Sequence, residues 1–212
     1  MSKAPQGKLA QVTGKNVSID PAEHYDDWAA RYNDDLLNEY GYTAHKLATL
    51  ALTRMLQDKS ASIIDVGCGT GLVGLELAES GFKTIDGIDI SKNMLAEAEK
   101  INVYRSLLWQ DAEKDSVIDD GAYNAVISAG SFGKGHMGPD ALGSLISMAV
   151  PNGLVVIFMN AEPFGDEDYA SHIRQLEEGN KWVVVRIEDH NYMEALDRPG
   201  KLIIARRVRI TS

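Results

Sequence analysis

Three closely spaced glycines follow a short apolar segment in the first third of the chain. The segment Ile63-Ile64-Asp65-Val66 is rich in β-branched residues, which favour a buried strand, and residues 72–80 place their leucines and alanine on one helical face. Gly67, Gly69 and Gly71 allow positive φ angles and let a ligand approach the backbone itself. The first amide groups of the helix would face that ligand. The pattern therefore predicts a strand, a nucleotide-type binding loop and a helix.

The residues around these glycines distinguish between two kinds of nucleotide loop. The G-x-G-x-x-G loop of dinucleotide-binding proteins needs glycine or alanine at position 72, which is leucine here. The stretch Asp65-Val66-Gly67-Cys68-Gly69-Thr70-Gly71 instead resembles the first motif of the class I S-adenosylmethionine-dependent methyltransferases. That family uses the loop for the methionine part of the cofactor. The resemblance implies cofactor contacts by Asp65, Gly67, Gly69 and Gly71, with Cys68 as a small loop residue beside the cofactor.

An acidic residue ends the next predicted strand. Residues 83–90 have the pattern of a strand, and Asp89 falls at its carboxyl end. A carboxylate at that place can accept hydrogen bonds from both hydroxyls of a ribose. Asp86 competes for this role but lies deeper within the strand. Ile90 and Met94 are placed to line an adenine pocket, although core packing explains them equally well.

Two later strand ends carry the other candidate cofactor contacts. The family resemblance implies that Asp111 accepts from the adenine amino group and that the Ala112 N–H donates to the ring, whereas a simple turn carboxylate is the alternative for Asp111. Ser128 lies in a predicted strand over residues 124–129. Because ligands of open α/β sheets bind at the carboxyl ends of strands, we also expect Ser128 at the cofactor site.

The loop over residues 130–137 contains the candidate catalytic residue. An imidazole has an unperturbed pKa of about 6.5, which suits removal of a proton from a hydroxyl, thiol or amine. His136 is therefore the candidate general base, with a merely solvated histidine as the alternative. The preceding residues 128–131 depart from the Asn/Asp-Pro-Pro-Tyr motif, so nothing here points to methylation of amide or nucleobase nitrogens.

An aromatic helix is predicted before the glycine loop. Asp20-Pro21-Ala22-Glu23 combines a capping residue, proline at the first helical position and a carboxylate that can reach the cap. Tyr25, Trp28 and Tyr32 then recur at helical spacing on one face. Such a stripe is consistent with packed core. It is also similar to the leading helix of many small-molecule methyltransferases, which implies that Tyr25 and Tyr32 contact the ligand.

The elements alternate in the order expected for an α/β fold. We predict a doubly wound, mostly parallel seven-stranded sheet with an antiparallel closing strand and helices on both faces. Residues 1–19 lack periodicity and are expected to form a flexible arm, followed by a methyltransferase domain over 20–212 with a helical cap at 20–57 and a Rossmann-like core at 61–212. The remaining predicted elements are helices over 43–56, 139–150 and 166–178, strands over 104–109 and 154–159, a turn at 151–153, a loop at 161–165, and an antiparallel pair over 182–187 and 202–210.

Composition narrows the choice of partners. The 212 residues are 44% hydrophobic and carry a formal net charge of −10, which weighs against a large interface with nucleic acid. The basic run at 206–209 is interpreted as a solvated sheet edge. A single cysteine and no apolar segment of membrane-spanning length favour a cytoplasmic protein without a membrane partner. The histidines and the cysteine show no zinc-binding spacing, so we expect no metal.

These observations lead to one hypothesis and two alternatives. The chain is identified by resemblance as a class I methyltransferase, most similar to the small enzymes typified by the Williams-Beuren syndrome region member. This implies S-adenosylmethionine as cofactor, S-adenosylhomocysteine as product and a small-molecule or, less simply, a protein acceptor. The alternatives are an NAD(P)-dependent oxidoreductase and a non-catalytic S-adenosylmethionine-binding protein. The Tyr42-x-x-x-Lys46 pair matches short-chain dehydrogenases but precedes the first strand, so we interpret it as coincidence and His45 as a surface histidine.

Overall fold

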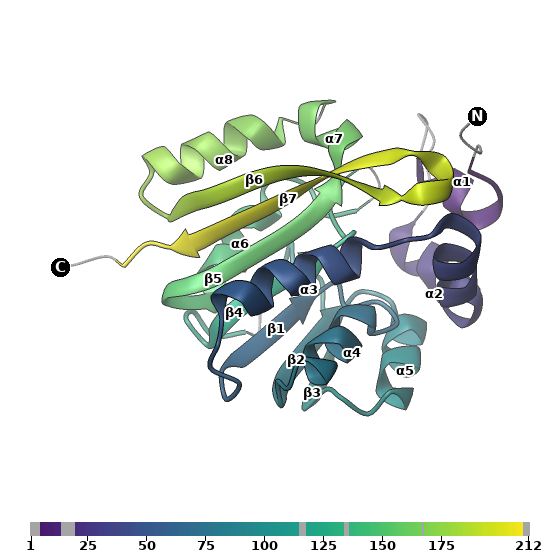
Figure 1. The fold of residues 1–212 in the computed structure, drawn as a ribbon, viewed down its shortest axis with the longest axis horizontal. Coiled ribbons are helices and arrows are strands. Elements are labelled where there is room, and N and C mark those ends of the chain that lie inside the picture. The colour runs from purple at the N-terminus through teal and green to yellow at the C-terminus, as the bar shows by residue number, and fades with distance from the viewer. Residues whose placement is uncertain (1–4, 14–19, 115–117, 134–135, 167, 210–212) are drawn as a thin grey trace.

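The computed structural model describes residues 5–13, 20–114, 118–133, 136–166 and 168–209. The strands within these ranges are β1 (Ser62–Val66), β2 (Thr84–Asp89), β3 (Ser106–Trp109), β4 (Tyr123–Ala129), β5 (Ala149–Asn160), β6 (Trp182–Met193) and β7 (Arg198–Arg207). They form one sheet in the order β3-β2-β1-β4-β5-β7-β6 (Figure 1). β1 to β5 run parallel, and β7 is antiparallel to β5 and β6. The predicted sheet is confirmed.

Helices cover both faces of the sheet. α3 (Ala44–Met55) and α4 (Leu72–Glu79) pack with Ile63 and Ile127 in one apolar core, whereas α6 (Ala141–Met148) and α8 (Tyr169–Glu178) pack with Ile64 and Val126 in the other. Successive residues of a strand point to opposite faces, so the two neighbouring isoleucines of β1 enter different cores. Helix α5 (Lys92–Lys100) follows β2 and contacts β2 and β3.

The helices before β1 form a cap at one end of the sheet. α2 (Pro21–Asn33) begins as predicted, with Asp20 Oδ1 accepting from the Ala22 N–H at 2.9 Å, and it continues into a π-helix at Asp34–Glu39. Within the region expected to be a flexible arm, Gly7–Thr13 forms helix α1 instead. Leu9 is 5% exposed in the core that also contains Trp28, so tertiary packing stabilises a helix that periodicity does not reveal.

The last third of the chain differs most from the prediction. β5 begins at Ala149, and the predicted turn at 151–153 is an irregularity inside this strand, with Asn152 at φ 65°. Residues 161–165, expected to be a loop, belong to helix α7 (Ala161–Asp166). α8 begins only at Tyr169, after Asp168 at φ 60°. The helix predicted over 166–178 is therefore confirmed as α8, with a start three residues later than expected.

The closing antiparallel pair is longer than expected. β6 continues to Met193, a 3₁₀ turn follows at Glu194–Leu196, and β7 begins at Arg198. β7 lies between β5 and β6, so the basic run at its end is not on a sheet edge. Arg207 in fact donates to the Ala149 carbonyl at 2.7 Å. None of the helices in the described ranges is both long and apolar enough to cross a membrane.

Candidate active site

A cavity of about 620 Å³ lies at the carboxyl ends of β1, β2 and β4, next to α2. Volumes of about 300–1,000 Å³ are typical of small-molecule and cofactor sites. Most of the residues predicted from the sequence line this cavity, namely Tyr25, Tyr32, Gly67, Cys68, Gly69, Asp89, Ile90, Met94, Asp111, Ala112 and His136. The carboxyl-end rule for open α/β sheets thus brings together side chains from five separate segments.

Gly69 and Gly71, two of the three glycines of the loop, have different structural roles. All have positive φ angles, 71° at Gly67, 53° at Gly69 and 90° at Gly71. A Cβ added to Gly69 would meet no atom within 4 Å, whereas one added to Gly71 would lie 2.5 Å from Ile101 Cδ1. Gly69 therefore leaves its backbone open to the cavity. Gly71 lies outside the lining and allows α4 to pack against the residues around α5.

Asp89 is held at the wall of the cavity by backbone amides. Its Oδ2 accepts from the Gly69 N–H at 2.8 Å, and its Oδ1 accepts from the Ser91 N–H at 2.8 Å. Burial raises the pKa of this carboxyl, although the backbone hydrogen bonds act in the opposite direction. Each oxygen keeps a second lone pair that can accept from a ligand. The carboxylate thus presents both oxygens, as recognition of a vicinal diol requires.

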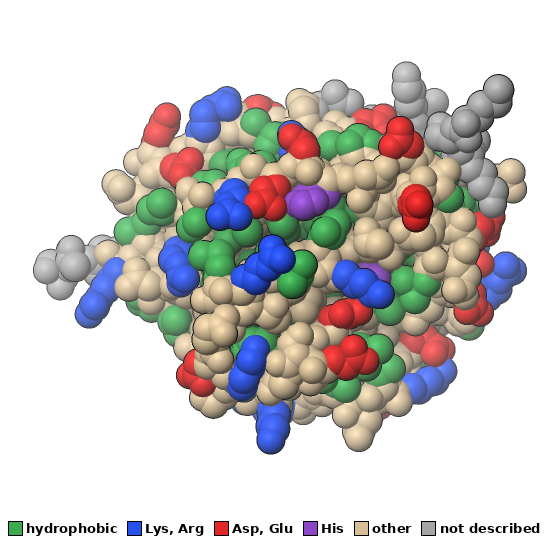
Figure 2. All heavy atoms as spheres, viewed as in Figure 1, with side chains coloured by type: hydrophobic (Ala, Val, Ile, Leu, Met, Phe, Trp, Pro, Cys, Tyr) green, Lys and Arg blue, Asp and Glu red, His purple; other side chains and the backbone are tan. Residues whose placement is uncertain are grey.

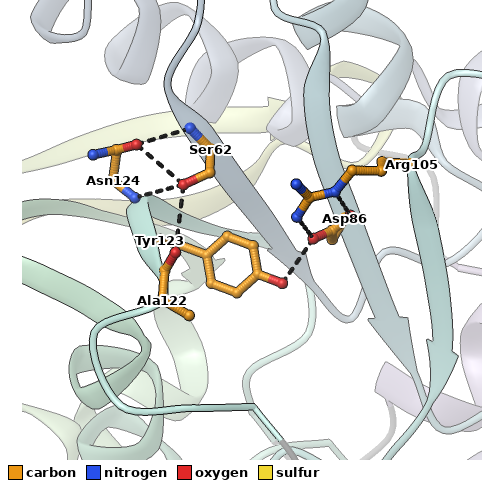
Figure 3. A network of polar contacts seen from close by, with 6 residues as sticks. All are labelled: Ser62, Asp86, Arg105, Ala122, Tyr123 and Asn124. Carbon is orange, nitrogen blue, oxygen red and sulfur yellow. Dashed lines mark hydrogen bonds and ion pairs between the residues drawn. The ribbon is translucent and has the colours of Figure 1, made fainter.

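Asp86, the competing acid, is used elsewhere. It is 3% exposed and pairs with the Arg105 guanidinium, and the Tyr123 hydroxyl donates to it at 2.8 Å (Figure 3). In the same view the Asn124 side chain accepts from the Ser62 N–H at 2.9 Å, next to Tyr123 on β4. These contacts tie β1, β2 and β4 together away from the cavity lining. The structure therefore separates the two acids into a structural one and one at the site.

Two further predicted residues are buried behind the cavity and do not line it. Asp65 is fully buried, and its Oδ2 accepts from the Tyr104 hydroxyl at 2.7 Å. Burial raises the pKa of Asp65 to about 7, which the Tyr104 hydrogen bond only partly offsets. Its Oδ1 and the Ser128 hydroxyl are buried and make no hydrogen bond with any described group.

The other end of the cavity is formed by the residues after β2 and β3. Ile90 and Met94 line it beside Asp111 and Ala112. Burial acts to raise the pKa of Asp111, but hydrogen bonds from Lys114 and from the Glu113 N–H outweigh it, and the pKa is lowered. Asp111 Oδ1 accepts from the Glu113 N–H at 3.0 Å. Asp111 is therefore a turn carboxylate, and it also lines the cavity.

Hydrogen bonds connect helix α2 to both sides of the cavity. The Tyr25 hydroxyl lies 2.5 Å from His136 Nε2. Asp26 Oδ1 accepts from the Asn93 N–H at 3.0 Å and from the Ser91 hydroxyl. At the end of the helix, the Thr70 hydroxyl of the glycine loop donates to Asn33 Oδ1 at 2.6 Å. The aromatic stripe is thus partly core, since Trp28 is 3% exposed, and partly cavity wall.

Sequence reasoning missed the residues that line the cavity from α3 and its start. Tyr42 and His45 both line it, and their rings stack with centroids 5.5 Å apart. The expectation that His45 is a surface histidine is wrong, because it is 3% exposed. Burial lowers the pKa of His45 to about 4, so the ring is neutral at neutral pH. No sequence signal marks these two residues, since Lys46 of the Tyr42-x-x-x-Lys46 pattern is 62% exposed and does not line the cavity.

Buried phenols surround the part of the cavity near Tyr42. Burial raises the pKa of Tyr25, Tyr32 and Tyr42, so all three remain protonated at neutral pH. Tyr192 of β6 packs against Tyr42 with ring centroids 5.8 Å apart. The Thr43 N–H donates to the Tyr192 carbonyl at 2.9 Å, and Tyr42 pairs with Met193 as an antiparallel bridge. The β6–β7 hairpin is thereby joined to the cap (Figure 1).

The remaining candidates are consistent with a site that works without a reactive thiol. Cys68 lines the cavity, but burial raises the pKa of its thiol well above the usual range. Within the described ranges, no group of three histidine, cysteine or acidic side chains is arranged to hold a metal ion.

The fold and site define a Rossmann-like class in which a glycine loop and an acid at the end of the second strand face one cavity. Comparison with known families then identifies the chain: residues 19–196 match the model of the methyltransferase domain family, and the chain belongs to that family. The resemblance to class I S-adenosylmethionine-dependent methyltransferases is confirmed. The match favours a methyltransferase over the NAD(P)-dependent alternative.

Individual relatives agree with this assignment. Human methyltransferase-like protein 27 is 35% identical over 136 residues, which are 63% of this chain and 55% of that protein. The 18S rRNA (guanine(1575)-N(7))-methyltransferase of Saccharomyces cerevisiae is 30% identical over 103 residues, 46% of this chain and 38% of that enzyme. The chain thus spans about half or less of these curated relatives. Magnesium protoporphyrin IX methyltransferase from Synechocystis PCC 6803 with bound SAM has the same fold, with a TM-score of 0.66 at 16% identity over 91% of this chain and all of that one (100%).

Proposed function

We propose that this chain binds S-adenosylmethionine in the cavity and transfers its methyl group to an oxygen, nitrogen or sulfur atom of a small-molecule acceptor. The observation that carries this proposal is the placement of Asp89, whose two oxygens are each held by one backbone N–H beside the open backbone of Gly69. In this assignment Asp89 accepts from both ribose hydroxyls. Asp111, Ala112, Ile90 and Met94 surround the adenine, and the loop from Gly67 to Gly69 faces the methionine part.

The cofactor, when bound, supplies an activated methyl group whose carbon–sulfur bond breaks toward sulfur as the bond to the acceptor forms. The protein has to align the acceptor, exclude water and take up the acceptor's proton. Tyr25 and His136 are arranged for the last task, because the phenol hydroxyl lies 2.5 Å from Nε2. The acceptor proton passes to Tyr25 Oη while the phenol proton passes to His136 Nε2. This relay keeps Tyr25 neutral, as its burial demands.

The cap over residues 20–57 completes the site in this proposal. Tyr25 and Tyr32 close the cavity from α2, and Asp26 attaches that helix to Ser91 and Asn93 at the start of α5. Since Ser91 also donates its backbone N–H to Asp89, the cap and the ribose acceptor share one residue. Binding of cofactor and position of the cap are therefore coupled through Ser91.

A small-molecule acceptor fits the charge of the chain better than RNA. The yeast relative is named as an rRNA methyltransferase, which makes RNA the competing substrate class. However, the formal net charge is −10, and on the face in Figure 2 the Lys and Arg side chains are interspersed with acidic and hydrophobic ones. Binding of a phosphate backbone relies on clustered cations. Protein acceptors are tested in a methyl-transfer assay with tritiated S-adenosylmethionine.

The direct test is calorimetric titration with S-adenosylmethionine, S-adenosylhomocysteine and NAD on the wild type, Asp89→Ala and Asp27→Ala. Asp27 is the matched control, because its side chain is 67% exposed on the same cap. Loss of the hydrogen bonds to a charged acceptor should weaken binding of the sulfur cofactors about 100-fold in Asp89→Ala and leave Asp27→Ala unchanged. Binding of NAD in place of the sulfur compounds would refute the assignment.

Catalysis needs a second measurement. Transfer of tritiated methyl groups from S-adenosylmethionine to a panel of metabolites, RNA and proteins should label a small molecule, and Asp89→Ala should lower that labelling. Tight cofactor binding with no transfer to any member of the panel would favour the non-catalytic binding protein.

A further inference from the structure

Aromatic rings line the part of the cavity that the proposed cofactor contacts do not use. Tyr25 and Tyr32 of α2, Tyr42 and His45 around the start of α3, and His136 after β4 all belong to the lining. The Tyr25 and Tyr32 rings meet edge to face, with centroids 6.0 Å apart and planes at 69°. The Tyr42 and His45 rings stack, with their planes 11° apart. Three separate segments of the chain thus contribute rings to the wall of one cavity.

The charged side chains of the lining favour a cation over an anion. Among the described residues that line the cavity, Lys114 is the one lysine or arginine, and it pairs with Asp111 at 2.9 Å. Three further acids, Asp20, Asp89 and Glu113, line the same cavity. The tyrosines of the lining stay protonated at neutral pH, because burial raises their pKa values. An anionic acceptor would therefore meet acids and neutral phenols in the described lining.

His45 holds a hydrogen-bond acceptor that lacks a donor. The side chain is 3% exposed, and its Nδ1 is buried without a hydrogen bond to any described group. Nε2 lies 3.9 Å from Glu76 Oε1, so the carboxylate favours the tautomer with the proton on Nε2. Nδ1 then carries a lone pair, since burial lowers the pKa of the ring to about 4 and keeps it neutral. A ligand that donates an N–H can satisfy this nitrogen, whereas an ionised carboxylate, which only accepts, cannot.

We infer that the methyl acceptor is a primary or secondary amine, which binds as its ammonium ion against the rings of Tyr25, Tyr32 and Tyr42; this inference rests on the methyl transfer proposed above. An ammonium group within about 6 Å of a tyrosine ring centre is attracted by the ring quadrupole, and the attraction grows when water is excluded. The described lining offers three such rings, the lone pair of His45 and no unpaired lysine or arginine. This combination suits an amine better than a carboxylate or a phosphate.

Proton transfer converts the bound ammonium ion into the nucleophile. One N–H proton passes to Tyr25 Oη while the phenol proton passes to His136 Nε2, 2.5 Å away. The nitrogen lone pair that this releases forms the bond to the methyl carbon, and the electrons of the carbon–sulfur bond remain on sulfur. The product is the N-methylated ammonium ion, so a positive charge lies against the rings before and after the reaction. An amine gives the relay a definite task, because an amine is mostly protonated, and therefore unreactive, at neutral pH.

The first test measures cation binding without catalysis. The protein saturated with S-adenosylhomocysteine is titrated calorimetrically with choline and with the neutral isostere of choline in which carbon replaces the quaternary nitrogen. The two probes have nearly the same shape, so the ratio of their affinities reports the effect of the charge. We expect choline to bind about threefold to 30-fold more tightly to the wild type, in the range of cation–π contacts that are partly desolvated.

Variants of Tyr32 connect this preference to the rings. Tyr32→Phe keeps a ring and should keep the preference for choline, whereas Tyr32→Leu should bring the affinity ratio towards one. Phe164→Leu is the matched control and should keep the wild-type ratio, because Lys201 Nζ lies 5.4 Å from this ring and Phe164 is not among the described residues of the lining. Since both probes are measured on each variant, a general loss of stability does not mimic a change in the ratio. Equal affinities in the wild type, or an unchanged ratio in Tyr32→Leu, would overturn the inference.

The second test identifies the nucleophile. Methyl transfer from tritiated S-adenosylmethionine is measured on a metabolite extract before and after its primary and secondary amines are acylated. We expect acylation to abolish labelling, and we expect the labelled product to withstand the alkaline hydrolysis that cleaves methyl esters. Tyr32→Leu should raise KM for the amine about threefold to 30-fold, and Tyr32→Phe should stay near the wild type.

The outcomes separate this inference from the proposed function. Label that persists after acylation, in a phenol, a carboxylate or RNA, would refute an amine acceptor while leaving methyl transfer intact. Failure to bind S-adenosylhomocysteine would refute the proposed function itself.

Discussion

The Tyr25 hydroxyl and His136 Nε2 lie 2.5 Å apart, although the two residues are 111 positions apart in the sequence. The contact joins the cap to the loop after β4, and both residues line the cavity. The sequence marks each residue as a separate candidate, but it does not indicate that the two are in contact.

Tyr25→Phe removes this hydroxyl and keeps the ring. We expect kcat to fall about tenfold to 100-fold, in the range of proton-transfer contributions, with cofactor affinity changed less than about threefold. His136→Ala should lower kcat by a similar factor, because the relay then lacks the group that takes up the phenol proton. Steady-state kinetics on both variants provide the measurement, and an unchanged kcat in His136→Ala would eliminate the relay.

Gly69→Ala and Gly71→Ala should distinguish a loss of cofactor affinity from a loss of stability. An alanine at position 71 meets Ile101 at 2.5 Å and also requires φ 90°, so the free energy of unfolding should drop by about 1–3 kcal/mol. An alanine at position 69 is also strained by φ 53° but meets no atom within 4 Å, so it should lower stability less and mainly weaken cofactor binding. Urea unfolding and calorimetry on both variants give the comparison. Equal loss of stability in the two would contradict the distinction between an open and a packed glycine.

His45 should make stability depend on pH below neutrality. Burial lowers its folded pKa from 6.5 to about 4, so between these values the unfolded chain binds more protons than the folded one. Stability therefore rises with pH through this window and is lost as pH falls, by at most about 3 kcal/mol. His45→Phe, which can still stack on Tyr42, should flatten the dependence. Urea unfolding at pH 4 to 8 measures it, with the half-exposed His172→Gln as control; a slope in His45→Phe equal to that of the wild type would argue against this origin.

The cofactor half of the site could be predicted because it depends on local patterns. Gly67, Gly69 and Asp89 follow short strands whose apolar periodicity is clear, and parallel pairing brings their carboxyl ends together. Asp65 was predicted at the same place, but it is fully buried and accepts from the Tyr104 hydroxyl, so it does not line the cavity. The apolar periodicity of a strand predicts on which face of the sheet a side chain lies, but it does not predict how deeply that side chain is buried.

The wall of the cavity that contains Tyr42 and His45 could not be predicted, because its structure depends on contacts between distant segments of the chain. Tyr42 lies at the cavity in contact with distant segments, since its hydroxyl donates to the Ala129 carbonyl and the adjacent Thr43 donates to the Tyr192 carbonyl, 149 positions later. His45 is buried against the Tyr42 ring. The start of β7 at Arg198 was not predicted either, since this strand was expected to begin four residues later. Helix α1 was missed for the same reason, as its core contacts lie on other elements.

The proposed cofactor contacts are close together along the chain, whereas the strands that complete the sheet come last. Every contact proposed for the adenine, the ribose and the methionine part of the cofactor lies between residues 65 and 112, and the β6–β7 hairpin inserts β7 between β5 and β6. A ribosome therefore delivers the segment with the glycine loop and Asp89 well before the hairpin. Until β7 is made, the edge of β5 has no antiparallel partner, so closure of the sheet has to wait for the last strand pair.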